Sequence, residues 1–82
     1  MFYKVFFKGE ARDQLRDLPK QIRRRIGYKV YLLQQNLAGD IKKLKAREQL
    51  YRLRIGSYRV FFTLEKDEIQ IYSIKDRKDA YD

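Results

Sequence analysis

Hydrophobic residues in the first half of the chain follow two different spacings. The aromatic and β-branched run at residues 2–7, which ends near Gly9, predicts a strand. From residue 10 to 18 the apolar positions recur every three or four residues, which predicts a helix. A second helix should start at Pro19, whose missing N–H costs nothing in a first turn, and end at Gly39, because glycine readily takes a positive φ as a helix cap. The apolar stripe of this second helix is Ile22, Ile26, Val30, Leu33 and Leu37.

In the second half of the chain, apolar residues recur at every second position, which is the spacing of strands. Residues 40–49 are mostly charged and predict a connecting loop. Three strands follow at 51–55, 58–64 and 69–74, separated by the turns Gly56-Ser57 and Lys66-Asp67. The expected fold is therefore α+β, in the order β-α-α-β-β-β, as one domain over residues 1–82. A small, antiparallel-rich sheet would be backed by an N-terminal helical hairpin on one face and left open on the other.

Composition narrows the chemistry that the chain can perform. The 82 residues include no cysteine and no histidine, which excludes disulfides, thiolate metal sites and the commonest general base at neutral pH. We therefore expect no metal and no cofactor, and any catalysis must use Tyr, Lys, Asp, Glu or Arg. We expect neither a signal peptide nor a membrane span, which favours the cytoplasm. The net charge of +9 makes polyanions, nucleic acid first, the expected partners.

Three arginines should share the open face of the sheet. Alternation along the hairpin turns Arg52, Arg54 and Arg59 away from the apolar side, and counting back from the turn places Arg54 opposite Arg59. Like charges directly opposed in a sheet destabilise it, whereas a phosphate between them would be held by their guanidinium groups. Phe61 should share this face as a stacking platform. The alternative is a solvated face whose arginines pair with Glu65, Asp67 or Glu68, although those acids cluster at the far turn.

The order of these motifs resembles the RelE/ParE toxin superfamily. The similar segments are Lys43-Leu44-Lys45, residues 50–62 (LYRLRIGSYRVFF) and residues 74–81 (IKDRKDAY). The resemblance implies a RelE-like microbial ribonuclease fold. It also implies a toxin of a type II toxin–antitoxin system, a metal-independent endoribonuclease that cuts mRNA in the ribosomal A site and so inhibits translation. Expected partners are the ribosome with its rRNA, the mRNA, and a cognate antitoxin with an acidic segment.

Individual roles follow from the resemblance by position. Arg59 and Arg77 match phosphate-binding and transition-state arginines, and Tyr81 matches a tyrosine that stacks on the substrate base and takes part in proton transfer. Arg52 and Arg54 occupy positions that are lysines in the best-studied branch. The expected RNA-binding residues are Lys43, Lys45, Phe61, Lys75 and Lys78.

Two departures from the family pattern leave the general base open. Arg52 and Arg54 cannot be bases, because arginine stays protonated at all working pH values. Many relatives have a histidine just before the tail arginine, where this chain has Asp76. The alternatives to a nuclease are a ParE-like inhibitor of DNA gyrase, a non-catalytic RNA-binding module and a toxin that has lost its activity. Retention of Arg59, Arg77 and Tyr81 favours the nuclease.

Overall fold

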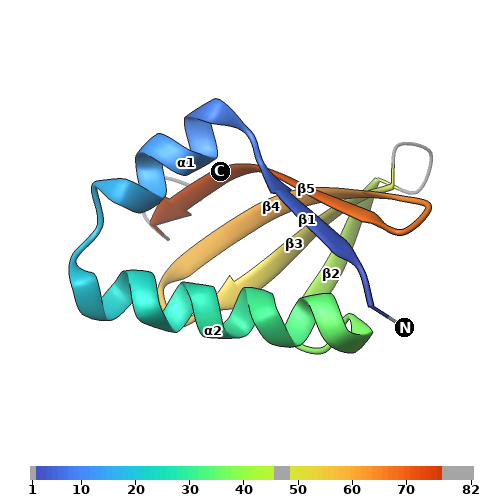
Figure 1. Cartoon of the computed structure of the whole chain (residues 1–82), viewed down its shortest axis with the longest axis horizontal. Helices are drawn as coiled ribbons and strands as arrows, with labels where there is room; N and C mark the ends of the chain where they lie inside the picture. The colour runs from blue at the N-terminus through green and yellow to red at the C-terminus, as the bar shows by residue number, and fades with distance from the viewer. Residues whose placement is uncertain (1, 46–48, 77–82) are drawn as a thin grey trace.

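The chain forms two helices and five strands in the computed structural model, which describes residues 2–45 and 49–76. In chain order the elements are β1 (Lys4–Phe7), α1 (Gly9–Arg16), α2 (Lys20–Asn36), β2 (Asp40–Lys45), β3 (Leu50–Ile55), β4 (Tyr58–Glu65) and β5 (Glu68–Asp76) (Figure 1). The site candidates Arg77, Lys78 and Tyr81 lie outside the described residues.

The strands form a single sheet in the order β1-β5-β4-β3-β2. The first strand runs parallel to β5, and all other neighbours are antiparallel. The predicted α+β class with an antiparallel-rich sheet and a helical hairpin is confirmed. The predicted element order is one strand short, because residues 40–45 form the edge strand β2 rather than a loop.

The missed strand has a physical explanation. Ile41, opposite Leu53, supplies the apolar residue that β2 packs inward, while Asp40 and Lys42 alternate with it outward. Lysine-rich strands are typical of sheet edges, where charge discourages pairing with another chain. A strand with so little apolar content therefore looks like a loop in the sequence.

The second helix ends two residues earlier than predicted. Leu37, not Gly39, takes the left-handed conformation (φ 56°), and its N–H donates to the carbonyl of Leu33 at 2.8 Å. Gly39 is required for a different reason: its φ is 140°, and a Cβ there would lie 2.7 Å from Cδ1 of Leu53. Glycine thus allows the chain to pass close over β3 as β2 begins.

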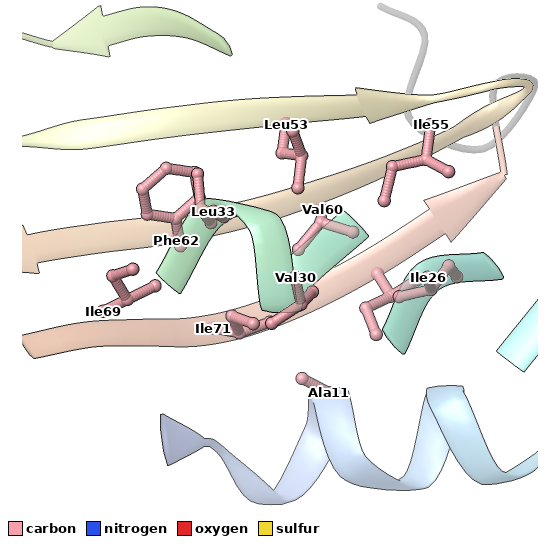
Figure 2. Packing of buried hydrophobic residues seen from close by; sticks show 11 residues of the cluster. Ala11, Ile26, Val30, Leu33, Leu53, Ile55, Val60, Phe62, Ile69 and Ile71 are labelled. Atoms are coloured by element: carbon pink, nitrogen blue, oxygen red, sulfur yellow. The ribbon is translucent and has the colours of Figure 1, made fainter. Parts of the chain in front are cut away.

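The hydrophobic core lies between the two helices and one face of the sheet (Figure 2). Ala11 from α1 and Ile26, Val30 and Leu33 from α2 are buried, which confirms the predicted stripe, and Ile22 and Leu37 pack at its ends. The sheet contributes Leu53, Ile55, Val60, Phe62, Ile69, Ile71 and Ile74. The helices therefore cover one face of the sheet, and no described helix covers the other.

Helix α1 covers the part of β5 that β1 does not reach. Strand β1 pairs only with residues 68–71, and α1 packs against β5. Gln14 on α1 accepts a hydrogen bond from the backbone N–H of the buried Ile74 at 2.6 Å through its Oε1. Losing such a partner leaves a buried donor unsatisfied at a cost of about 1–3 kcal/mol. The bond therefore helps to hold the end of β5, where Lys75 lies.

Candidate nucleic-acid interface

The outer face of the sheet carries a row of charged residues that crosses four strands. Gly56 begins the hairpin turn with a φ of 59°, and Ile55 pairs with Tyr58 as predicted. The same register places Arg54 opposite Arg59, so the predicted like-charge pair is present. The row continues on both sides, in the order Asp40, Arg54, Arg59, Lys75. We call these four residues the charged row.

A second row lies next to the charged row on the same face. It consists of Lys42, Arg52, Phe61 and Ser73, in register across β2, β3, β4 and β5. Phe61 is half-buried, and its ring lies 6.3 Å from that of Tyr72 at an angle of 34°. The face therefore combines cations for phosphates with aromatic rings on which bases can stack.

Asp40 pairs with both arginines of β3. Its Oδ1 lies 3.6 Å from Nη2 of Arg52, and its Oδ2 lies 3.8 Å from Nε of Arg54. The acids predicted as alternative partners, Glu65, Asp67 and Glu68, lie at the opposite end of β4. There Glu65 pairs with Glu68 beside the turn that joins β4 to β5. Asp40 and Lys42 were not predicted to join the arginines, because the segment 40–49 has the charged composition of a loop. The alternation Asp40-Ile41-Lys42 was the signal that could have revealed both residues.

The arginines differ in how they are held. The Arg52 side chain is only 20% exposed, and its Nε is buried without a hydrogen-bond partner in the described structure. Arg54 is 54% exposed. Arg59 donates long hydrogen bonds from Nη1 to the carbonyls of Gly56 (3.4 Å) and Tyr58 (3.3 Å), which hold its guanidinium beside the hairpin turn. Buried donors without partners are rare in folded proteins, so Arg52 is held beside Asp40 with part of its guanidinium unsatisfied.

The structure separates Lys43 from this face. Lys43 pairs with Tyr51, and its Nζ lies 5.6 Å from the centre of the Tyr51 ring. That ring stacks on the buried Phe62 at 5.4 Å, so Lys43 belongs to the helix-covered side of the sheet. Alternation therefore turns Lys43 away from the arginines, and its expected contact with RNA stays a prediction. Lys75 joins the charged row, while Lys45 pairs with Leu50 through its backbone and its side chain is outside the description.

Two other kinds of site are not found in the part of the chain that the structure describes. Residues 2–45 and 49–76 contain no cluster of three or more carboxylate, histidine or cysteine side chains able to hold a metal ion. Neither α1 nor α2 has the length and apolar character needed to cross a membrane.

Comparisons with known proteins agree with this architecture. A family profile described as "ParE toxin of type II toxin-antitoxin system, parDE" matches residues 5–81. Toxin RelE3 from Methanocaldococcus jannaschii is 33% identical over 84 residues, covering 96% of this chain and 96% of that protein.

Two solved structures of archaeal complexes have the same fold. A chain of the RelE–RelB complex from Pyrococcus horikoshii OT3 matches with a TM-score of 0.84 at 30% identity, covering 98% of this chain and 100% of the other. A chain of the RelB–RelE antitoxin–toxin complex from Methanococcus jannaschii matches with a TM-score of 0.78 at 32% identity, covering 94% and 95%. The protein whose sheet carries the charged row therefore belongs to the RelE/ParE superfamily of toxins from type II toxin–antitoxin systems.

Proposed function

We propose that this toxin is a metal-independent endoribonuclease that cuts mRNA in the ribosomal A site and thereby stops translation in the cytoplasm. The observation that carries the proposal is the opposed pair Arg54 and Arg59, flanked by Lys75 and Arg52, on the face that the helices leave uncovered. Opposed like charges cost folding stability, and an RNA phosphate offsets that cost when it binds. Phe61 beside them offers a ring on which a base can stack.

The proposed reaction is attack of the RNA 2′-hydroxyl oxygen on the adjacent phosphorus. The bond from phosphorus to the 5′ oxygen breaks, the 2′-hydroxyl loses its proton to a base, and the leaving 5′ oxygen gains one. The products are a 2′,3′-cyclic phosphate and a 5′-hydroxyl, and DNA is inert because it lacks the nucleophile. Arg59 and Arg77 stabilise the charge that develops on the phosphoryl oxygens, at about 3–4 kcal/mol for each critical donor.

The ribosome would orient the mRNA strand, for which so small a protein has little surface. Much of the barrier to this reaction is removed by positioning the nucleophile in line with the leaving oxygen. An 82-residue chain with an open sheet face can hold a phosphate but offers little surface to orient the whole strand. The A site would fix the mRNA, and the cations of the toxin, Lys45 and Lys78 included, would bind the phosphates around the cut.

The decisive experiment maps mRNA ends on translating ribosomes incubated with the purified protein. We expect cuts at the A-site codon ending in 2′,3′-cyclic phosphates, and only weak cutting of the same RNA without ribosomes. A DNA gyrase supercoiling assay runs in parallel, because the matching family profile is named after ParE. Gyrase inhibition without cleavage would assign the ParE-like activity, and RNA binding without either effect would assign a binding module.

Tyr81 is the residue we propose for base stacking and proton relay. Tyr81→Phe keeps the ring and loses the hydroxyl, so single-turnover cleavage on programmed ribosomes should fall roughly 100-fold, the lower end of the range for general acid–base catalysis. Tyr81→Ala should be slower still, because stacking is lost as well. Thermal melts of both variants serve as the control for folding. Wild-type cleavage by Tyr81→Ala would remove the residue from the site.

We also propose that an antitoxin with an acidic segment binds the charged row. The two archaeal relatives at 30% and 32% identity were solved in complexes named RelE–RelB and RelB–RelE. The net charge of +9 and the open cationic face suit a negatively charged partner. Such a segment would block RNA by occupying the same arginines.

The antitoxin proposal predicts a strong salt dependence of association. The association rate with the protein encoded beside this toxin's gene should fall roughly tenfold or more between low and high salt, since long-range attraction is screened. Stopped-flow fluorescence measures the rate, and RNA competition measures occlusion. A partner that bound tightly while RNA still reached Arg54 and Arg59 would contradict direct occlusion.

A further inference from the structure

Asp40 is the one acid in the charged row and the row next to it, which form part of the outer face of the described sheet. Five cations share these rows, namely Lys42, Arg52, Arg54, Arg59 and Lys75. Each carboxylate oxygen of Asp40 faces a different arginine, Oδ1 toward Arg52 and Oδ2 toward Arg54. One anionic group with two oxygens between two guanidiniums is also the arrangement that a bound phosphate would adopt.

The contact between Asp40 and the arginines is loose. Its distances of 3.6 Å and 3.8 Å exceed those of charge-assisted hydrogen bonds, about 2.7–2.9 Å. The Asp40 side chain is 59% exposed and stands on the first residue of an edge strand. Exposed ion pairs of this kind contribute little stability. A stronger anion can therefore replace the carboxylate without unfolding its surroundings.

We propose that Asp40 is an internal competitor for the RNA phosphate, which must displace the carboxylate from Arg52 and Arg54 before the substrate is bound. The inference rests on the proposed function and extends it to how the toxin selects its substrate. Competition lowers the affinity for RNA in solution, where nothing else holds the strand. On the ribosome the strand is already positioned, so its phosphate displaces Asp40 at a small entropic cost. Asp40 thus helps to confine binding to ribosome-held mRNA.

The test is Asp40→Asn, which keeps the shape of the side chain and removes its charge. The probe is a short oligoribonucleotide with 2′-O-methyl groups, which blocks the proposed nucleophile so that binding is measured without cleavage. By fluorescence anisotropy at low salt, Asp40→Asn should bind roughly 3- to 5-fold more tightly, the upper end of the range for an exposed ion pair. The gain should shrink at high salt because exposed charges are screened.

A matched control separates local competition from overall charge. Asp67→Asn changes the net charge equally but lies in the turn between β4 and β5, at the opposite end of β4 from the charged row. It should bind the probe within about twofold of wild type, the scale of a screened distant charge. In an Arg54→Gln background, Asp40→Asn should keep only part of its gain, because Arg52 remains as a partner of Asp40 and double-mutant cycles report direct coupling.

Four results would overturn the proposal. The first is equal affinity of Asp40→Asn and Asp67→Asn, and the second is a gain that survives unchanged in the Arg54→Gln background. The third is a lower melting temperature of Asp40→Asn with no change in affinity, which would make Asp40 only a neutraliser of arginine repulsion. The fourth is absence of probe binding by every variant. Tighter binding by Asp40→Asn in a protein that never cuts on ribosomes would support competition while the nuclease proposal fails.

Discussion

Arg59→Ala should lower cleavage on ribosomes about 100- to 1000-fold, the usual loss when one donor to a developing oxyanion is removed. Its guanidinium is directed by weak hydrogen bonds to the carbonyls of Gly56 and Tyr58 and faces away from the core. The substitution also removes the like charge opposite Arg54, which offsets the loss of those bonds. The melting temperature should therefore stay close to that of the wild type. Single-turnover cleavage on programmed ribosomes is the measurement.

Two further variants make the Arg59 result specific. Arg12→Ala removes the same charge from the exposed side of α1, away from the sheet, and should cleave at nearly the wild-type rate. Arg59→Lys keeps the charge but loses the planar fork, so it should recover only part of the activity. Cleavage by Arg59→Ala within twofold of wild type would refute the phosphate role, and full activity of Arg59→Lys would reduce that role to charge alone.

Phe62→Ala should remove about 3–5 kcal/mol from the free energy of unfolding, the usual cost of truncating a buried aromatic side chain. Phe62 is 1% exposed at the centre of β4 and stacks on Tyr51. A domain of this size has only about 4–12 kcal/mol in total, so the variant should melt at least roughly 15 °C lower or fail to accumulate. Urea and thermal unfolding measure the effect.

The neighbouring phenylalanine is a natural control for that prediction. Phe61 precedes Phe62 in the chain but lies on the outer face in register with Arg52, where it is only half-buried. Phe61→Ala should keep most of the stability and instead weaken RNA binding by about 1–3 kcal/mol, if a base stacks on its ring. Equal destabilisation by the two substitutions would contradict the assignment of the helix-covered and open faces.

Local pattern was sufficient for the features that depend on short sequence separation. The spacing of Ile26, Val30 and Leu33 located the buried side of α2, and the two-residue turn at Gly56-Ser57 set the register of the hairpin. The opposition of Arg54 and Arg59 followed from that register alone, because the period of a strand is two and a two-residue turn leaves no freedom. The central pair of the candidate site was therefore predictable from the sequence.

Predictions from the hydrophobic pattern were wrong where a structural feature depends on contacts between residues far apart in the chain. The segment from Asp40 to Lys45 has too little apolar content to predict a strand, and its pairing with β3 supplies the stability that its own composition lacks. Similarly, the need for glycine at position 39 comes from the methyl of Leu53, fourteen positions later, rather than from the helix end.

The two helices, the hairpin, the excess of positive charge and the placement of Arg52, Arg54 and Arg59 on the outer face could all be predicted from the sequence, because periodicity and turn chemistry are local. Which residues join these arginines depends instead on how strands far apart in the chain pair with one another. Adding β2 at the sheet edge brought Asp40 into contact with them, and the same alternation turned Lys43 away toward Tyr51. The electrostatics of the face depend on the order in which strands pair, and strand order is set by burial of the shared core rather than by the charges themselves.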